Sequence, residues 1–206
     1  MAMKDTRNLG ALRSQDGHFE IIPSFLSAKS ADELFATLMQ TINWKTEVVK
    51  MFGKTIETRR QVAFFGKVSV SYGYSGTRHE AKPLPDTLTE VLKKVRIHCD
   101  APFNTVLATF YPDGNSGLGW HRDDEAELGP RSQIQIASLS LGATRQFEIR
   151  NQLTQDTQRF RLESGALAHM NQGFQDQWQH RVLKEPKIQT PRINLSFRTL
   201  KTYPAP

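Results

Sequence analysis

At 206 residues, of which 38% are hydrophobic and 23% charged, the chain has the length and composition of one soluble globular domain with a sizeable core. Its single cysteine, Cys99, excludes an internal disulfide framework and a metal site built from several thiolates, and no apolar stretch is long enough to cross a bilayer. The net charge of +6 favours a polyanionic partner, although many soluble proteins are mildly basic without binding nucleic acid.

The N-terminal segment, residues 1–17, is predicted to be a flexible lead to a single domain over residues 18–206. Its polar start lacks the apolar region of a signal peptide, and with the lone cysteine this predicts a cytoplasmic protein. We also expect a monomer without membrane association.

Two amphipathic helices are predicted in the first half of the chain. Ser30-Ala31-Asp32-Glu33 has the capping-box pattern, in which a serine oxygen and a glutamate bond the free N–H groups at a helix start. The apolar residues that follow fall on one helical face: Leu34, Phe35, Leu38, Met39 and Ile42. A second helix is predicted from about Asp86, with Leu88, Val91, Leu92 and Val95 facing inward.

The remaining chain has the pattern of strands. The region from Glu47 to Tyr74 carries Phe52-Gly53-Lys54, which we place at a hairpin tip. After Phe103, short apolar or alternating runs are separated by turn residues. These runs are Val106–Tyr111, Ile134–Leu141, Gln146–Ile149, Phe160–Leu162 and Ile193–Thr199. The predicted fold class is α+β: a jelly roll, or double-stranded β-helix, over residues 103–200, with the helices packed on one sheet.

His121, Asp123 and His180 form a candidate metal site. His121 and Asp123 are two residues apart, so on an extended segment they point the same way, and His180 is expected from a strand facing them across the sheets. Two imidazoles and one carboxylate are the facial triad that holds non-haem Fe(II) and leaves coordination positions open. His169 is the main rival ligand, but its apolar neighbours favour a core histidine.

The segment from Arg192 to Arg198 alternates polar and apolar residues, so four polar side chains share one strand face. They are Arg192, Asn194, Ser196 and Arg198. Two guanidinium groups facing a cavity need anions, and 2-oxoglutarate is a dianion with a carboxylate at each end. A solvated face, or an ion pair with Asp123 or another acid, remains an equal alternative on this pattern alone.

Five further motifs accompany these residues. They are Phe103-Asn104-Thr105-Val106-Leu107, Tyr111-Pro112-Asp113-Gly114, His121-Arg122-Asp123-Asp124-Glu125, Ser138-Leu139-Ser140-Leu141-Gly142 and Trp178-Gln179-His180-Arg181-Val182. Together with the Arg192–Arg198 segment they resemble the AlkB-type dioxygenases, and within that family the eukaryotic-type DNA repair branch. The resemblance extends from about Phe25 to Pro204.

The resemblance implies the cofactors Fe(II), 2-oxoglutarate and O₂, with the metal on His121, Asp123 and His180. It implies that Arg192 binds the distal carboxylate of 2-oxoglutarate, helped by Tyr111 and Ser196. Arg198 would lie near the metal-side carboxylate and Asp123, with Asn194 nearby. Thr109 stands where the family commonly has Asn, so the affinity for the co-substrate is expected to differ.

By the same resemblance, the activity is oxidative removal of N-alkyl groups from flipped-out bases such as 1-methyladenine and 3-methylcytosine, in double- or single-stranded DNA or in RNA. Tyr74 would stack on the base opposite His121, near Tyr72, and Glu125 or Asp124 would accept hydrogen bonds from the exocyclic amine. Sheet packing is the alternative for the two tyrosines.

Residues 47–76 resemble the family's nucleotide-recognition hairpins. Phe52 would fill the gap that a flipped base leaves, and nearby cations, including Lys54 and Arg60, would hold phosphates. Without the resemblance, Phe52 is a core or hairpin residue and the cations form a solvated face.

Two other functions compete with DNA dealkylation. One keeps the chemistry but moves the substrate to RNA or a protein side chain. The other is a catalytically silent jelly-roll binding module, which the intact set of His121, Asp123, His180, Arg192 and Arg198 disfavours.

Overall fold

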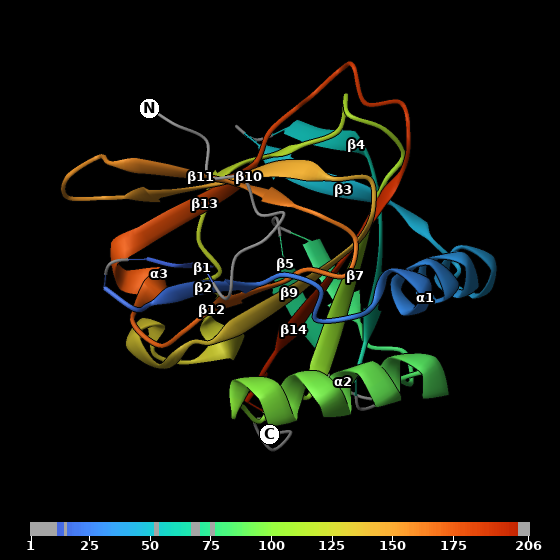
Figure 1. Cartoon of the computed structure of the whole chain (residues 1–206), viewed down its shortest axis with the longest axis horizontal. Helices are drawn as coiled ribbons and strands as arrows, with labels where there is room; N and C mark the ends of the chain where they lie inside the picture. Colours follow the sequence, from blue (N-terminus) through green and yellow to red (C-terminus); the bar gives the residue numbers. More distant parts are fainter. Residues whose placement is uncertain (1–11, 15, 52–53, 67–70, 75–76, 202–206) are drawn as a thin grey trace.

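Two antiparallel sheets face each other across an apolar interior in the computed structural model, which describes residues 12–14, 16–51, 54–66, 71–74 and 77–201 (Figure 1). The major sheet has eight strands in the order β1 (Leu12–Arg13), β2 (Phe19–Ile22), β12 (Leu167–Met170), β9 (Ile136–Gly142), β14 (Arg192–Arg198), β7 (Thr105–Tyr111), β4 (Lys54–Phe65) and β3 (Lys45–Met51). The minor sheet has β11 (Thr157–Leu162), β10 (Arg145–Asn151), β13 (Trp178–Val182) and β8 (Leu118–His121). The predicted fold class is confirmed.

Alternation along β14 divides the major sheet into an apolar and a polar face. Ile193, Leu195 and Phe197 are fully buried in the core under the helices. The four polar residues of this strand point the other way, toward the interior between the sheets, where Phe147, Ile149 and other apolar side chains pack. A row of buried polar groups therefore faces the minor sheet.

Helices α1 (Ala28–Thr41) and α2 (Asp86–Cys99) cover the outer face of the major sheet (Figure 1). All four predicted inward positions of α2 are buried, namely Leu88, Val91, Leu92 and Val95. The other helical segments are α3 (Phe174–Gln177) and the 3₁₀ turns Ala126–Leu128 and Arg131–Gln133. No helix in the described ranges is long and apolar enough to cross a membrane.

The start of α1 differs from the sequence prediction. Ser27, not Ser30, is the N-cap, and its hydroxyl oxygen accepts a hydrogen bond from the backbone N–H of Ser30 at 3.2 Å. The N-cap therefore lies three residues before the serine of the predicted capping box. Ser27 and Ser30 both carry a hydroxyl suited to an N-cap, and the structure uses the earlier one.

The sheet extends beyond the predicted core of residues 103–200 at both edges. β3 and β4 form a hairpin in which Met51 pairs with Lys54, and β4 continues the sheet through β7. At the other edge, β2 pairs with β12 and with β1, so Leu12 and Arg13, within the predicted flexible lead of residues 1–17, form a strand. Asp16 also accepts a hydrogen bond from the indole Nε1 of Trp178 at 2.7 Å. The strands β5 (Ser71–Tyr74) and β6 (Thr77–Glu80) form a separate two-stranded sheet.

Substituting Ser27→Ala tests the observed helix start. We expect it to lower the free energy of unfolding by about 1 kcal/mol, because it removes the acceptor that caps α1. Urea denaturation followed by circular dichroism measures this loss. The matched variant Ser30→Ala should cost less, and the reverse order would place the cap at Ser30.

Candidate metal centre

His121 and His180 lie side by side because they are paired residues on two adjacent antiparallel strands. His121 ends β8 and His180 lies in the middle of β13, where the two residues pair in register. Their ring centroids are 4.0 Å apart. The sequence prediction that His180 faces His121 from the opposite sheet is therefore wrong, since both strands belong to the minor sheet. The close approach still brings the two imidazoles to one point between the sheets.

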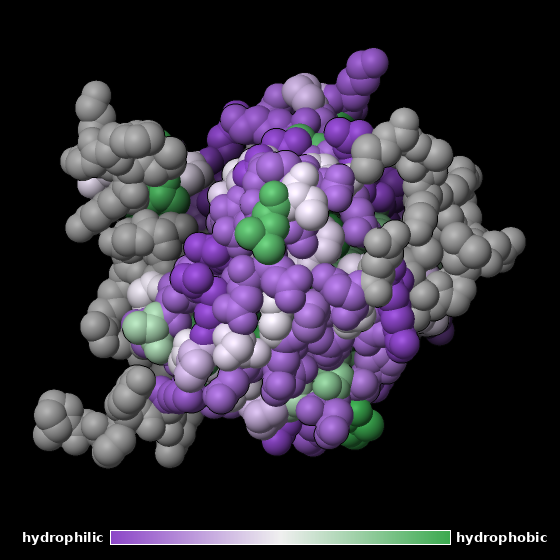
Figure 2. Space-filling view, turned by 90° about the vertical axis from the view of Figure 1, so that its left-hand side faces the viewer, coloured by the Kyte–Doolittle hydropathy of each residue, from purple (hydrophilic) through white to green (hydrophobic). Residues whose placement is uncertain are grey.

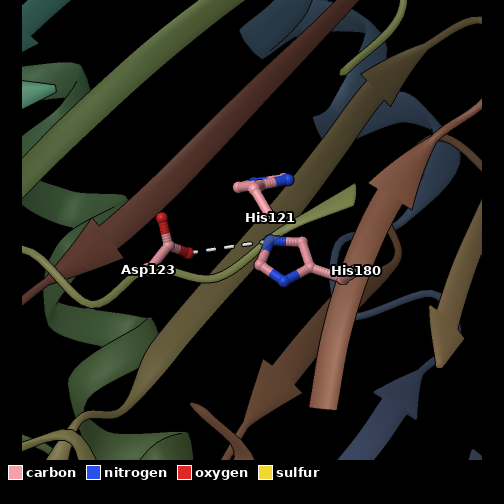
Figure 3. Close-up of side chains that lie close together, drawn as sticks. All are labelled: His121, Asp123 and His180. Carbon is pink, nitrogen blue, oxygen red and sulfur yellow. Dashed lines mark ion pairs between the residues drawn. The ribbon is translucent and has the colours of Figure 1, made fainter. Parts of the chain in front are cut away.

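Asp123 completes the cluster from the loop that follows β8 (Figure 3). The candidate ligand atoms of the three residues all lie within 4.8 Å of one another. One carboxylate oxygen, Oδ2, is 3.7 Å from Nε2 of His180, and the other, Oδ1, accepts a hydrogen bond from Arg198 at 2.7 Å. Arg198 therefore anchors the carboxylate from the major sheet while one oxygen faces the imidazoles.

The charge states of the cluster suit a cation. Burial, and after it the neighbouring His121, lowers the pKa of His180 to about 3. Burial also lowers the pKa of His121. For Asp123, burial alone raises the pKa, but Arg198 and the two imidazoles outweigh it and bring the pKa below its usual value. Near neutral pH the site thus holds two neutral imidazoles and one carboxylate, which is the protonation state that metal binding requires.

Backbone and side-chain partners fix the ligands. Nδ1 of His121 lies 2.8 Å from the carbonyl oxygen of Gly119, so in the tautomer that donates this hydrogen bond Nε2 keeps its lone pair for a metal. The backbone N–H of Asp123 donates to Oε1 of Gln175 at 3.1 Å. Gln175 is fully buried on α3, and the sequence analysis missed it because a single glutamine in a loop-like segment carries no pattern.

His169, the rival ligand, lies outside this cluster on β12. Its Nδ1 is 3.5 Å from Oε1 of Glu20, and its Nε2 is 3.1 Å from Oε1 of Gln135. The favoured assignment as a buried core histidine fits these contacts.

A pocket beside the three ligands is lined by the polar face of the major sheet. Asn194 and Ser196 on β14 lie next to Thr109 and Tyr111 on β7 and Ser138 on β9. Asn194 Oδ1 accepts a hydrogen bond from Ser138 at 2.9 Å, and its Nδ2 donates to Ser196 at 3.0 Å. Apolar side chains complete the lining: Leu107, Leu118, Phe147, Met170 and Val182. The predicted co-substrate residues other than Arg192 therefore meet around one pocket.

Arg192 lies behind this lining, with its guanidinium 5.1 Å from the ring centroid of Tyr111. It is 1% exposed, which rules out a solvated face. Its Nη2 donates to Ser140 and Asn194, whereas Nε and Nη1 have no hydrogen-bond partner among the described residues. Burial lowers the pKa of Arg192 to about 10, so it stays charged at neutral pH. A buried cation without a carboxylate partner in the described chain fits an anionic ligand.

The structure separates the predicted base-contacting acids from the pocket. The Asp124 carboxylate is held by Arg131 at 2.8 Å and faces Arg122 at 3.4 Å. Neither Asp124 nor Glu125 is among the described residues that line the pocket. Their contact with a base stays a prediction.

Arg60 is predicted from the sequence to hold a phosphate, but the structure buries it. Its side chain forms an ion pair with Glu47, and the two residues are 4% and 1% exposed. The pair is formed across β3 and β4, a contact that the sequence pattern does not reveal. Arg60 therefore supports the hairpin from inside and does not reach a phosphate at the surface.

The other predicted substrate contacts fall outside what the structure describes. Phe52 lies outside the described residues, as do the side chains of Lys54, Tyr72 and Tyr74, although the backbone places both tyrosines on β5. A contact that the sequence did not predict joins β5 to the segment that follows Asp123, which we call the metal loop. Glu127 Oε1 accepts a hydrogen bond from the backbone N–H of Gly73 at 3.2 Å.

Comparisons with known proteins agree with this site. The model of the 2OG-Fe(II) oxygenase superfamily matches residues 18–198. The chain is 35% identical over 196 residues to the alpha-ketoglutarate-dependent dioxygenase alkB homolog 3 of Bos taurus, covering 90% of this chain and 66% of that protein. It is 34% identical over 186 residues to the DNA oxidative demethylase ALKBH2 of Homo sapiens, covering 82% and 69%. The solved structure of OsALKBH1 has the same fold, with a TM-score of 0.62, 17% identity and coverage of 88% and 98%.

Replacing Gln175 with leucine tests the support of Asp123. The variant keeps a side chain of similar size but loses the acceptor for the Asp123 N–H, so we expect metal affinity to fall about tenfold. Titration calorimetry with Mn²⁺ measures this change. Gln177→Leu, an exposed position on the same helix, is the matched control, and equal Mn²⁺ affinity in both variants would contradict the assigned role.

Proposed function

The chain belongs to the 2OG-Fe(II) oxygenase superfamily and to its AlkB-type members, and from this premise we propose that it is an Fe(II)- and 2-oxoglutarate-dependent demethylase of nucleobases in DNA. The observation that carries the proposal is the cluster of His121, Asp123 and His180, of which the last two are buried, beside a buried guanidinium without a carboxylate partner among the described residues. When bound, Fe(II) with 2-oxoglutarate and O₂ supplies oxidation of an N-methyl group, which leaves as formaldehyde while the co-substrate becomes succinate and CO₂.

The donor set fits Fe(II). Two neutral imidazoles and a carboxylate from three residues leave positions open for a co-substrate and O₂. His121 is held by the Gly119 carbonyl and Asp123 by Arg198 and Gln175, so the ligands are arranged before a metal binds. This pre-arrangement lowers the reorganisation that metal binding requires.

Arg192 and its neighbours are proposed to bind the distal carboxylate of 2-oxoglutarate. Two nitrogens of the guanidinium have no partner among the described residues, and Tyr111 separates them from the pocket in this conformation. If the Tyr111 ring rotated, or if the co-substrate bound beside it, the distal carboxylate would contact the Arg192 guanidinium. Charge-assisted bonds of this kind are among the stronger ones that buried arginines make.

The apolar pocket walls suit chemistry on a methyl group. Leu118, Val182 and Phe147 surround the ligands from the minor sheet, and Phe147 lies 5.7 Å from the His180 ring. These side chains exclude water from the reacting carbon and position an uncharged methyl group beside the metal ligands.

DNA is the proposed substrate. The similarity to the human DNA oxidative demethylase ALKBH2 and the net charge of +6 both support this choice. The Glu127 bond to Gly73 ties β5, which carries Tyr72 and Tyr74, to the loop that follows Asp123. Base recognition by that hairpin would thereby be coupled to the metal loop.

We further propose that the protein acts as a monomer. The large hydrophobic residues exposed in the described chain, Ile56, Ile97 and Leu153, lie on separate elements and form no patch. The face in Figure 2 is likewise hydrophilic over most of its described surface, with isolated apolar side chains. A stable dimer would need a broader apolar face.

Formaldehyde release from a panel of oligonucleotides tests the proposed activity. Single- and double-stranded DNA carrying one 1-methyladenine or 3-methylcytosine should yield formaldehyde and succinate in equal amounts. Asp123→Ala should abolish both products, because the carboxylate ligand is lost. Turnover restricted to methylated RNA or to peptides would identify that class as the substrate in place of DNA. If no alkylated substrate gave both formaldehyde and succinate, the proposal would be overturned.

Substituting Arg192→Met tests co-substrate binding. Removing the charge should raise the KM for 2-oxoglutarate by one to two orders of magnitude, since charge-assisted hydrogen bonds contribute about 1.5–3 kcal/mol. The KM for the methylated oligonucleotide should stay unchanged. Arg192→Lys should recover part of the affinity, and an unaltered 2-oxoglutarate KM in Arg192→Met would exclude the assigned contact.

A further inference from the structure

A groove runs beside the metal pocket, between β4 and two loops at residues 113–117 and 183–187. We call it the flanking groove, and its wall includes Glu57, Arg59, Asn115, Ser116, Leu118 and Lys184. Leu118 also lines the metal pocket, and Gly119, which holds His121 through its carbonyl, lies in the groove wall as well. The groove therefore begins at the side of the reaction site.

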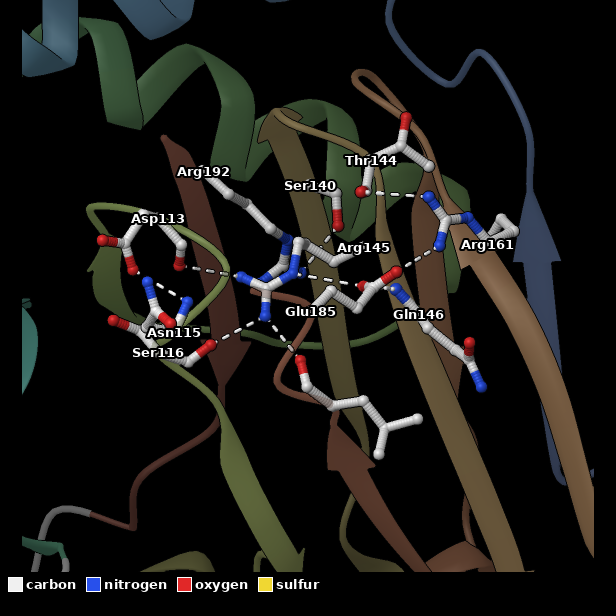
Figure 4. A network of polar contacts seen from close by, with 11 residues as sticks. Asp113, Asn115, Ser116, Ser140, Thr144, Arg145, Gln146, Arg161, Glu185 and Arg192 are labelled. Atoms are coloured by element: carbon white, nitrogen blue, oxygen red, sulfur yellow. Dashed lines mark hydrogen bonds and ion pairs between the residues drawn. The ribbon is translucent and has the colours of Figure 1, made fainter. Parts of the chain in front are cut away.

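The two loops of the groove are held together by Arg145, which is 1% exposed (Figure 4). Its guanidinium donates to the carbonyl oxygens of Asp113 and Ser116 in one loop and of Leu183 in the other. It also pairs with the Glu185 carboxylate at 3.3 Å. A buried arginine that bonds both loops fixes their separation, so this wall is rigid before any ligand binds.

Backbone contacts close the same two loops on each other. The Gly114 N–H donates to the Ile188 carbonyl at 2.8 Å, and the Glu185 N–H donates to the Gly114 carbonyl at 2.7 Å. A Cβ at position 114 would lie 1.9 Å from the Glu185 carbonyl oxygen, so only glycine permits this approach. The groove wall is thus a packed structure and not two independent surface loops.

Two donors on this wall have no partner in the described part of the chain. Ser116 is 3% exposed, and its hydroxyl has no hydrogen bond there although it lines the groove. Buried hydroxyls are nearly always hydrogen-bonded, so this one indicates a missing ligand or water. Lys184 is exposed on the same wall, and it forms no ion pair with any described residue.

The other charged side chains of the groove either form ion pairs within the protein or are negative and would repel an anion. Arg59 is paired with Asp113 at 2.7 Å, and Arg60 is paired with Glu47. Glu57 is an exposed carboxylate on the β4 side. Among the described residues of the groove wall, Ser116 and Lys184 are therefore the side-chain donors that bond no other residue, and together they suit one phosphate.

We propose that the flanking groove binds one phosphodiester of the nucleic-acid strand next to the base in the metal pocket, with the Lys184 ammonium and the Ser116 hydroxyl as donors. This inference rests on the proposed function, because a base in the pocket stays tethered to its own strand. Phosphate contacts of this kind fix the register of a strand without reading its sequence. They would place the methylated base without restricting its neighbours.

Lys184→Gln, with Lys187→Gln as its control, tests the groove. Lys187 lies on the same loop and is exposed, but it is not among the described residues of the groove wall. Fluorescence anisotropy with a labelled single-stranded oligonucleotide over a salt series gives the Kd and its salt dependence. Lys184→Gln should raise the Kd several-fold and reduce the slope of log Kd against log salt by about 0.7, the value for one phosphate contact. Identical behaviour of the two variants overturns the proposal.

Two further variants separate binding from structural effects. Ser116→Ala removes an unsatisfied buried hydroxyl, so it should leave the Tm unchanged or higher while weakening oligonucleotide binding. Glu57→Gln should strengthen binding, because it removes a repulsive carboxylate. An unchanged Kd in Ser116→Ala, or binding lost only together with the Tm, contradicts the assignment of the hydroxyl.

The failure of the groove and the failure of the proposed function give different results. Anisotropy needs no turnover, so a Lys184-dependent Kd without formaldehyde release would keep the groove and reject the demethylase. Demethylation of oligonucleotides with the same KM in Lys184→Gln and wild type would keep the enzyme and reject the groove. Displacement of the oligonucleotide by millimolar inorganic phosphate at constant ionic strength would assign the site to free phosphate and also reject it.

Discussion

The buried ion pair between Asp123 and Arg198 is the interaction on which the site depends. A carboxylate that is 2% exposed requires a compensating charge, and Arg198 supplies it from the opposite sheet at 2.7 Å. The pair joins the loop after β8 to the end of β14, and it thereby aligns the two sheets around the imidazoles. A divalent cation between the three ligands would satisfy the carboxylate oxygen that Arg198 leaves facing His180.

Strand β14 organises the rest of the pocket because its two faces have opposite chemistry. One face packs Ile193, Leu195 and Phe197 under the helices, which fixes the strand in the core. The other face presents Arg192 and Arg198 at opposite ends of one polar row, with Asn194 bonded to Ser138 and Ser196 between them. We propose that a dianion with a carboxylate at each end would bind the metal through one carboxylate and Arg192 through the other.

Patterns local in sequence predicted much of this arrangement. The apolar face of α2, the alternation of Arg192–Arg198 and the spacing of His121 and Asp123 are local patterns, and the structure has them. His180 is grouped with this pair from the order of ligands along the chain and from the family resemblance, and it does join the cluster. The predictions that were wrong concern the strand register between segments that are distant in the sequence. Whether His180 opposes His121 within one sheet, and whether Arg60 meets Glu47 inside the hairpin, is set by strand pairing that the sequence does not encode locally.

Supporting residues were the hardest to predict, for the same reason. Gln175, Arg145 and Ser116 have ordinary residue types at positions without periodicity, and only the folded chain shows that each is almost completely buried. Their roles follow from what they contact: Gln175 contacts the Asp123 backbone, Arg145 contacts the carbonyls of two loops, and Ser116 lines an open groove. The start of α1 is a smaller case, since Ser27 and Ser30 both carry a capping hydroxyl and the local pattern does not distinguish them.

The central claim is that metal and 2-oxoglutarate bind to one cavity through the Asp123 cluster and Arg192. Equilibrium binding of 2-oxoglutarate, measured with and without Mn²⁺ under anaerobic conditions, tests it most directly because the two ligands must then strengthen each other. The account predicts that Mn²⁺ lowers the Kd for 2-oxoglutarate in the wild-type protein and has no effect in Asp123→Ala. Equal 2-oxoglutarate affinity with and without Mn²⁺ in the wild type would contradict it.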